Sequence, residues 1–261
     1  MFQPIVVGSG LSAWSLLKKT MDTQTAAFEK SPEIVSDTEY FAANIGEIDS
    51  AEELVNDFRL LKVALGAYGL DDDVYNKFFV QKILDEGTLT TDALANKLTD
   101  TKYKEMSADF GFGDFSTPST KLSTFAGEII EKYNERQFEI SVGQQDANMR
   151  LALNLERELS IIANNDASPD TMWFSVLGSE PLRTVFETAL GLPENFASLD
   201  LDRQVEELRS RVQNFMGDGE ITQFSDPENL EKLNQRFLLM SQMQSFGVQS
   251  SGQIALTLLQ Y

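Results

Sequence analysis

The chain has 261 residues, 42% hydrophobic and 24% charged, which is the composition of a folded globular protein. Asp and Glu total 41 against 21 Lys and Arg, so the formal net charge is −20, which opposes binding to nucleic acid and to anionic membranes. The chain has no Cys and no His, which excludes disulfides, thiol nucleophiles, imidazole metal sites and the Ser-His-Asp triad. Catalysis by carboxylates with Mg²⁺, or by Lys, Tyr and Ser, is left open by this composition.

The N-terminal segment combines glycines with apolar residues. Ile5-Val6-Val7 leads into Gly8-Ser9-Gly10, and Glu29 follows at the spacing of the acid in a dinucleotide-binding fingerprint. That fingerprint needs a second parallel strand before the acid, whereas a helix start at Ser31-Pro32 follows here. We therefore expect a Gly-rich segment that leads into an amphipathic helix, and no bound cofactor.

The same segment is unsuited to crossing or entering a membrane. Its apolar part, residues 5–17, is shorter than the about 18 residues that span a bilayer. Lys18 and Lys19 follow it, whereas a Sec signal peptide carries its positive charges first. We expect no membrane insertion and no Sec signal peptide, so the protein is cytoplasmic or leaves by another route.

One strong helical pattern lies between residues 50 and 69. Its apolar side chains recur at spacings of four and three and predict a single helix; they are Leu54, Phe58, Leu61, Leu65 and Tyr68. Ser50 and Glu53 form a capping box at its start. Gly69 supplies a residue that can adopt the left-handed conformation and end the helix.

Similar patterns recur along the rest of the chain. The predicted stripes are Leu122, Phe125, Ile129 and Tyr133; Leu151, Leu155, Leu159 and Ile162; Leu201, Val205, Leu208, Val212 and Phe215; and Leu230, Leu233, Phe237 and Met240. Ser168-Pro169 and Asp226-Pro227 are typical helix starts, and Asp200 is a third cap. No segment alternates with period two between turn residues. We expect an all-α fold, a compact multi-helix array without significant sheet.

The organisation into halves is predicted from a loop and a repeat. Residues 111–120 are rich in Gly, Ser, Thr and Pro, which favours an N-terminal helical half at 1–115 and a C-terminal helical half at 116–261. The halves are either separate or parts of one continuous domain. Leu60–Leu70 aligns with Leu182–Leu192, which indicates two halves related by duplication. Leu98-Thr99-Asp100 and Phe224-Ser225-Asp226 each precede a predicted helix and extend the similarity. Two short matches are fewer units than repeat architectures need, so chance similarity remains the alternative.

Two groups of acidic residues are candidate cation sites. Asp71-Asp72-Asp73 directly follows the helix stop at Gly69, and Asp200 and Asp202 lie at another helix start. Acids at such positions are also typical caps that complement the helix dipole. Capping is the favoured interpretation, and a divalent-cation site is the alternative.

Both chain ends are uncharged in an otherwise acidic protein. Phe2 to Leu17 and Phe246 to Leu259 contain apolar residues and no charged residue. Either end packs on the protein's own core or docks on a partner helix or groove. The candidate partner-binding residues are Trp14, Leu17, Phe246, Leu256 and Leu259. No catalytic, cofactor-binding or metal-binding residue is assigned.

Short motifs along the whole chain carry a resemblance to one family. They are Gly10, Trp14, Tyr40-Phe41, Asp57–Leu61, Ala64–Leu70, Asp72, Ala95–Leu98, Phe110–Gly113, Gln137–Glu139, Val142–Gln145, Trp173, Pro181–Arg183, Ala189–Pro193 and Asp200–Gln204. In this set and order the chain resembles the uncharacterised alphaproteobacterial family "domain of unknown function 1217". The family has no assigned activity, so no catalytic residue is transferred.

The resemblance implies a cellular setting. Members of that family are often encoded among flagellar genes, which implies flagellar protein partners and a structural, assembly or chaperone-like role. Localisation would then be cytoplasmic or through the flagellar secretion route. We therefore expect a non-enzymatic, flagellum-associated binding protein; the alternative is a carboxylate- and divalent-cation-dependent enzyme of unknown substrate.

Overall fold

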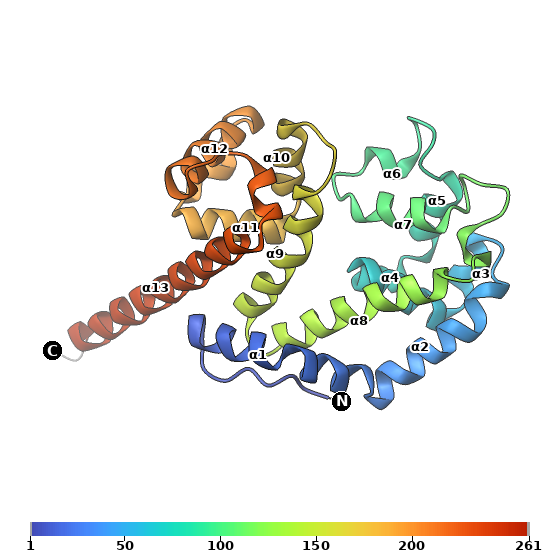
Figure 1. Ribbon diagram of the computed structural model, residues 1–261, viewed down its shortest axis with the longest axis horizontal. Helices are drawn as coiled ribbons and strands as arrows, with labels where there is room; N and C mark the ends of the chain where they lie inside the picture. Colours follow the sequence, from blue (N-terminus) through green and yellow to red (C-terminus); the bar gives the residue numbers. More distant parts are fainter. Residues whose placement is uncertain (1, 260–261) are drawn as a thin grey trace. The chain divides into compact units, whose positions relative to one another are not determined.

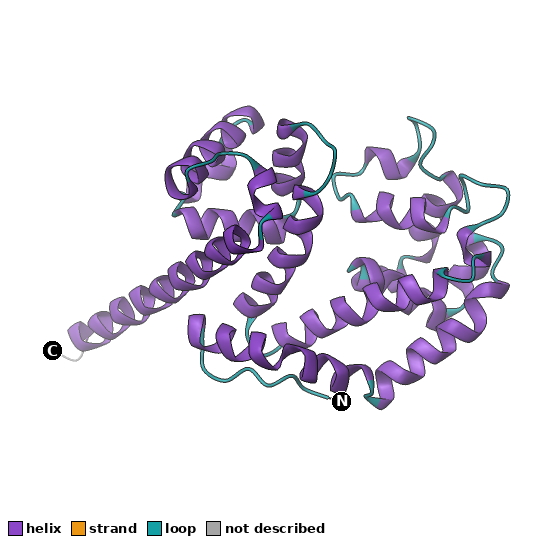
Figure 2. Ribbon diagram, viewed as in Figure 1, coloured by secondary structure: helices purple, strands orange, loops and turns teal. Residues whose placement is uncertain are grey.

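The protein is described by a computed structural model that covers the backbone of residues 2–259 and the side chains of residues 2–193 and 195–245. Over this backbone the chain forms α-helices, short 3-10 helices and loops, and no strand (Figures 1 and 2). The predicted all-α class is therefore confirmed. None of the helices within residues 2–259 has both the length and the apolar character needed to cross a membrane.

Thirteen α-helices lie within residues 2–259. They are α1 (Gly10–Glu29), α2 (Pro32–Asn44), α3 (Ala51–Asn56), α4 (Phe58–Tyr68), α5 (Lys77–Glu86), α6 (Leu94–Lys97), α7 (Lys102–Phe110), α8 (Phe125–Gly143), α9 (Ala147–Ala163), α10 (Pro169–Gly178), α11 (Glu180–Leu190), α12 (Leu201–Met216) and α13 (Pro227–Leu259). The 3-10 helices are η1 (Ile45–Glu47), η2 (Asp71–Tyr75), η3 (Ser119–Lys121), η4 (Glu194–Ser198) and η5 (Ile221–Ser225).

The chain divides into two compact units that are interleaved in sequence. Unit 1 comprises residues 1–4 and 20–141, and unit 2 comprises residues 5–19 and 142–261. Helix α1 therefore contributes its first half to unit 2 and its second half to unit 1. The division at residue 141 falls within α8, whereas the sequence places it between residues 115 and 116.

The loop at residues 111–120 belongs to unit 1 and is held there by specific contacts. The Asp114 carboxylate accepts hydrogen bonds from the backbone N–H groups of Thr88 (2.7 Å) and Leu89 (3.1 Å) and from the Thr88 hydroxyl (2.7 Å). A Cβ atom added to Gly113 would lie 2.4 Å from the backbone nitrogen of Gly87, so the loop packs directly on the end of α5. Its Gly- and Ser-rich composition marks a tight contact rather than a linker.

Unit 1 is built around α4. From Leu60 to Tyr68 every residue except Lys62 is buried, because this segment is almost continuously apolar. Helices α2, α3 and α7 pack around it. The ring of Tyr133 in α8 lies so close to Gly66 that an added Cβ would be 2.8 Å from two ring carbons.

The helix predicted through residues 54–68 is two helices, which corrects the sequence expectation. The Asp57 carboxylate accepts from the backbone N–H groups of Arg59 (2.9 Å) and Leu60 (3.1 Å), so the chain ends α3 and starts α4 at this residue. Phe58 consequently leaves the apolar stripe and is 46% exposed. The capping box at the start of α3 is confirmed, since Ser50 accepts from the Glu53 N–H and the Glu53 carboxylate accepts from the Asp49 N–H.

The other predicted stripes lie on helices, except that Leu122 precedes its helix. The first residue of two stripes, Leu122 and Leu201, is exposed. Leu122 precedes α8 and is 61% exposed, and Leu201 begins α12 and is 59% exposed. Ser168 and Asp200 cap α10 and α12 as expected, each accepting from a backbone N–H three residues later.

Tyrosine hydroxyl groups in unit 1 donate to aspartate carboxylates. The four pairs are Tyr40–Asp57 (2.6 Å), Tyr68–Asp109 (2.7 Å), Tyr133–Asp37 (3.1 Å) and Tyr103–Asp73. Two of these carboxylates also bind a lysine ammonium group, Lys62 on Asp37 (2.7 Å) and Lys132 on Asp109 (2.6 Å). Carboxylates that are buried, as Asp37 is, or partly buried need such donors, and the His-free chain supplies them from tyrosine and lysine.

Unit 2 is built around α11 in a similar way. Helices α9, α11 and α13 pack on one another, and η5 covers α9. The rings of Trp173, Phe186 and Phe224 form edge-to-face contacts at centroid distances of 5.6 and 6.0 Å. Asn234 of α13 is fully buried and donates to the Ala152 carbonyl of α9 at 3.1 Å, which fixes the two helices against each other.

The aligned segments of the repeat have the same local structure. Gly69 and Gly191 are both left-handed, with φ of 68° and 61°, and end α4 and α11. In each case the backbone N–H of the residue after the glycine donates to the carbonyl five residues earlier. Leu70 donates to the Leu65 carbonyl (3.0 Å), and Leu192 donates to the Glu187 carbonyl (2.9 Å). The matched residues upstream are all buried; they are Leu60, Val63 and Ala67, and Leu182, Val185 and Ala189.

The surroundings of the repeat agree as well. In unit 1, α3 ends directly before α4, and the 3-10 helix η2 follows α4. In unit 2, α10 ends directly before α11, and the 3-10 helix η4 follows α11. The segments at residues 98–100 and 224–226 also precede helices as predicted, since Asp100 and Asp226 accept from the first turns of α7 and α13.

The shared helix stop predicts a matched pair of mutational effects. Gly69→Ala and Gly191→Ala should each lower the free energy of unfolding by about 1 kcal/mol, because a Cβ atom disfavours the left-handed conformation. Gly127→Ala is the control: Gly127 lies inside α8 with no atom within 4 Å of an added Cβ, so this variant should be more stable than the parent. Chemical denaturation of the three variants measures the differences; equal effects at all three glycines would contradict the assignment.

The tyrosine–aspartate pairs predict alkaline sensitivity. Burial raises the pKa of Tyr68, Tyr103 and Tyr133, and the neighbouring carboxylates raise each further. The folded chain thus keeps phenolic protons that the unfolded chain releases at about pH 10. The stabilisation is complete below about pH 10 and is lost as the pH rises further. Denaturation between about pH 8 and pH 11 should show this loss, and Tyr68→Phe should reduce its slope; a parallel slope in the variant would contradict the mechanism.

Candidate functional site

Two of the candidate partner-binding residues lie in the core of unit 2. Trp14 and Leu17 are 2% and 0% exposed. The Trp14 indole N–H lies 3.3 Å from both carboxylate oxygens of Glu231 in α13. Lys18 pairs with Glu156 of α9 at 2.7 Å, and its ammonium group lies over the Trp14 ring. The first half of α1 is thus packed on its own unit, and a docking role of Trp14 and Leu17 would require it to leave this position.

The other three candidates, Phe246, Leu256 and Leu259, lie outside the described side chains. Their helix, α13, has its last charged residue at Arg236, and no Asp, Glu, Lys or Arg occurs from residue 237 to the end of the sequence. Within the described part of this uncharged segment, Leu239 and Met243 are 45% and 60% exposed. In this part of α13, exposed apolar side chains therefore alternate with residues such as Gln242 that contact the rest of unit 2.

The glycine-rich segment at the N-terminus does not form a nucleotide-binding turn. Residues 2–7 have no regular secondary structure, and α1 starts at Gly10. A Cβ atom on Gly10 would lie 2.7 Å from the Gln242 side-chain oxygen, so this glycine permits close packing on α13. This corresponds to the favoured interpretation of the segment.

Three of the five acidic residues considered as cation sites, Asp71, Asp73 and Asp200, are engaged in local contacts. Asp71 accepts from the Gln137 amide at 2.6 Å, Asp73 accepts from the Asn76 amide and from the Tyr103 hydroxyl, and Asp200 caps α12. Among the residues searched, which are those the structure describes, no three acidic side chains are placed to share a metal ion.

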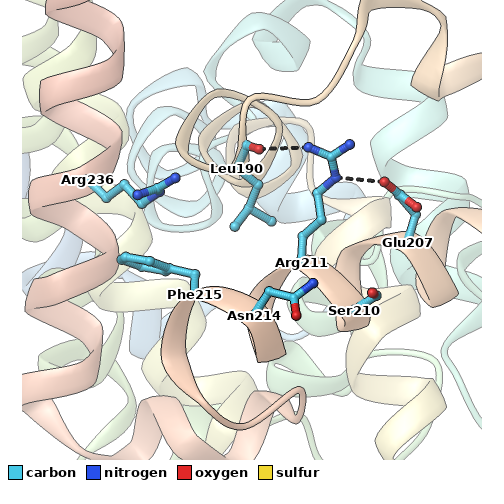
Figure 3. A pocket seen from close by; sticks show the side chains of 7 residues that line it. All are labelled: Leu190, Glu207, Ser210, Arg211, Asn214, Phe215 and Arg236. Atoms are coloured by element: carbon cyan, nitrogen blue, oxygen red, sulfur yellow. Dashed lines mark hydrogen bonds and ion pairs between the residues drawn. The ribbon is translucent and has the colours of Figure 1, made fainter.

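Unit 2 contains a cavity of about 570 Å³ that no sequence pattern indicated (Figure 3). One face of α12 forms most of its lining, since residues at spacings of three and four lie on the same side of a helix. The lining residues are Leu190, Glu207, Ser210, Arg211, Asn214, Phe215 and Arg236. Figure 3 shows Arg236 and Phe215 on one side of the opening, with Arg211, Glu207 and Ser210 on the other.

The two arginines satisfy the carbonyl groups at the end of α11. Arg211 donates to the Leu190 carbonyl (3.1 Å) and pairs with Glu207 (2.6 Å), and Arg236 donates through Nε to the Ala189 carbonyl (2.7 Å). The Arg236 guanidinium also lies over the Phe215 ring at 4.3 Å. Cations at a helix C-terminus complement its dipole, so both arginines have a structural role.

Unit 1 carries an exposed aromatic surface that the sequence patterns also missed. Tyr75 and Phe78 are each 82% exposed, and the Tyr75 ring lies 6.3 Å from that of the half-exposed Phe58. Phe58 is the first residue of α4, Tyr75 is the last residue of η2, and Phe78 lies in the first turn of α5. The predicted stripe placed Phe58 on its buried side and included neither Tyr75 nor Phe78, so this exposed surface was not expected.

The position of Trp14 predicts a stability effect. Trp14→Ala should lower the free energy of unfolding by about 3 kcal/mol, because it removes a buried indole and leaves a cavity. Leu11→Ala on the same helix removes a side chain that is 37% exposed and should cost less than about 1 kcal/mol. Chemical denaturation measures both, and near-equal small effects would show that the first half of α1 is not held in the core.

Known proteins provide a family and a structural relative. The family model "Protein of unknown function (DUF1217)" matches residues 67–230. The X-ray crystal structure of the protein AGR_C_984 from Agrobacterium tumefaciens is similar to this fold, with a TM-score of 0.76 and 28% sequence identity over 93% of this chain and 97% of that chain. No curated protein matches the sequence. Because the model matches more than half of the chain, the chain belongs to the family of proteins of unknown function DUF1217.

Proposed function

We propose that the protein is a non-enzymatic, flagellum-associated binding protein with a structural, assembly or chaperone-like role, and that the uncharged segment of α13 is its docking surface. The observation that carries the proposal is the exposure of Leu239 and Met243 on a helix with no charged residue after Arg236. Exposed apolar faces of a helix are a common mode of partner recognition.

The charge of the whole chain supports docking through this segment. With a net charge of −20, most of the surface repels acidic proteins and copies of itself. An uncharged helix can instead enter an apolar groove without the cost of removing charged groups from water. The contrast between the uncharged segment of α13, which follows Arg236, and the charged remainder of the chain therefore favours this segment as the contact surface.

The flagellar setting rests on the resemblance described above, in which family members are encoded among flagellar genes. A helix that presents apolar side chains and no charge is suited to packing against a helix of a partner protein. The binding role agrees with the local engagement of Asp71, Asp73 and Asp200, whose carboxylates cap or bind neighbouring groups. Export or cytoplasmic action are both compatible with this role.

The proposal predicts loss of partner binding when the exposed face of α13 is made polar. Leu239→Gln combined with Met243→Gln should reduce co-purification with flagellar subunits from motile cells by roughly tenfold or more. Removal of residues 246–261 should abolish it. Both changes leave the buried contacts of Asn234 and Phe237 in place, so thermal stability should change little.

The matched control is Leu122→Gln, which makes the same chemical change at a residue of unit 1 that is 61% exposed. It should retain full binding. Deletion of the gene should impair swimming, and the wild-type gene but not the double variant should restore it. Unchanged binding in the truncated protein would reject α13 as the surface, and normal swimming without the gene would reject the flagellar role.

A further inference from the structure

The cavity between α11, α12 and α13 of unit 2 has no part in the docking proposed above. We propose that it is a binding site for an organic anion, in which a carboxylate or phosphate group is joined to an apolar body. The site would act independently of the α13 docking surface, because its residues end at Arg236, before the exposed Leu239 and Met243.

The cavity offers hydrogen-bond donors for an anionic group. Arg236 uses Nε for the Ala189 carbonyl, and within the described residues its two terminal nitrogens have no hydrogen-bond partner. The Nη2 nitrogen of Arg211, the Ser210 hydroxyl and the Asn214 amide are likewise without a partner among the described residues. The parallel N–H groups of a guanidinium fit the oxygens of carboxylate and phosphate in a bidentate pair.

The local charge is opposite to that of the whole protein. Two guanidinium groups line the cavity, and Glu207 is the single carboxylate among the lining residues. Its carboxylate is occupied by Arg211 at 2.6 Å, whereas Arg236 forms no ion pair with a described residue and donates to the carbonyl end of α11. A chain of net charge −20 thus presents a cationic hollow, which attracts an anion that the rest of the surface repels.

The walls of the cavity favour an anion with an apolar body. The Phe215 ring carries Arg236 on its face, and Leu190 contributes a side chain to the lining. A volume of about 570 Å³ lies in the range of small-molecule pockets, about 300–1,000 Å³, and exceeds what a bare phosphate fills. A ligand that places an aryl or alkyl group near Phe215 would bury apolar surface in addition to its ion pair.

Capping of α11 alone does not account for the arrangement. The capping bonds use Nε of Arg236 and Nη1 of Arg211, and a helix end needs no open hollow beside it. The same roles make arginine variants poor tests, because they also remove helix caps. Ser210 lines the cavity and is exposed, and its hydroxyl forms no hydrogen bond with a described residue. An acidic residue in its place therefore changes the charge of the site and spares the fold.

The experiment is calorimetric titration of the full-length protein at low salt with phenyl phosphate and phenylacetate. Inorganic phosphate and acetate lack the phenyl group, so their affinities measure how much the apolar body contributes. Benzyl alcohol lacks the charge, so its affinity measures how much the anionic group contributes. We expect the two aryl anions to bind and to raise the melting temperature, each about tenfold more tightly than its inorganic or methyl counterpart, with no binding of benzyl alcohol. The ratio between the two aryl anions assigns the preferred head group.

Ser210→Asp should weaken the aryl anions about tenfold, because it places a carboxylate among the donors. Gln213→Glu is the matched control, since it adds the same charge to an exposed position of α12 outside the lining, and it should bind as the parent does. The site is rejected if the parent binds neither aryl anion, if Ser210→Asp binds as tightly as the parent, or if both variants lose affinity equally. Loss of α13 docking in the co-purification experiment would not alter any of these outcomes.

Discussion

In each unit, the C-terminal carbonyl groups of one buried helix need hydrogen-bond donors, and neighbouring elements supply them. Helices α4 and α11 are surrounded by other helices, so their last carbonyl groups need hydrogen-bond donors from the protein. Left-handed glycines at 69 and 191 turn the next N–H group back onto each helix. In unit 2, Arg211 and Arg236 supply further donors, and the hollow beside α11 is a product of how these two long side chains reach it.

The excess of acidic residues imposes a second constraint, which the units meet with different partners. Unit 1 places aspartates beside tyrosine hydroxyls and lysines, as at Tyr133–Asp37 and Lys132–Asp109. Unit 2 uses the Trp14 indole for Glu231 and arginine for Glu207. Such pairs keep the folded state compatible with a large negative charge, because a carboxylate near the core that accepts from a donor is less costly to bury.

Features with a local cause could be predicted from the sequence. The helix stops at Gly69 and Gly191 and the caps at Ser50 and Asp200 depend on residues within a few positions, so their signals are contained in short segments. The break at Asp57 was missed, because the apolar stripe continues in phase through it. The bond from Tyr40 that reinforces this break is a tertiary contact that periodicity does not carry.

The functional surfaces depended still more on tertiary structure. The sequence around Trp14 is compatible with packing on its own chain and with docking on a partner. Tertiary contacts, such as the one with the Glu231 carboxylate, distinguish the two. Glu207, Arg211 and Asn214 occupy what reads as the polar, solvent-facing side of α12. That face becomes a cavity wall only because Arg236, from a helix later in the chain, closes it.

The division of α1 between the units bears on how the chain folds during synthesis. Residues 5–19 are made before residues 20–141 but belong with residues 142–261, so unit 2 cannot be completed until unit 1 has been made. Such long sequence separation slows folding, since the loop must close before the contacts form. Trp14 and Leu17 remain uncovered during that interval. The first half of α1 therefore gains its burial late, when the helices of unit 2 that cover it have been made.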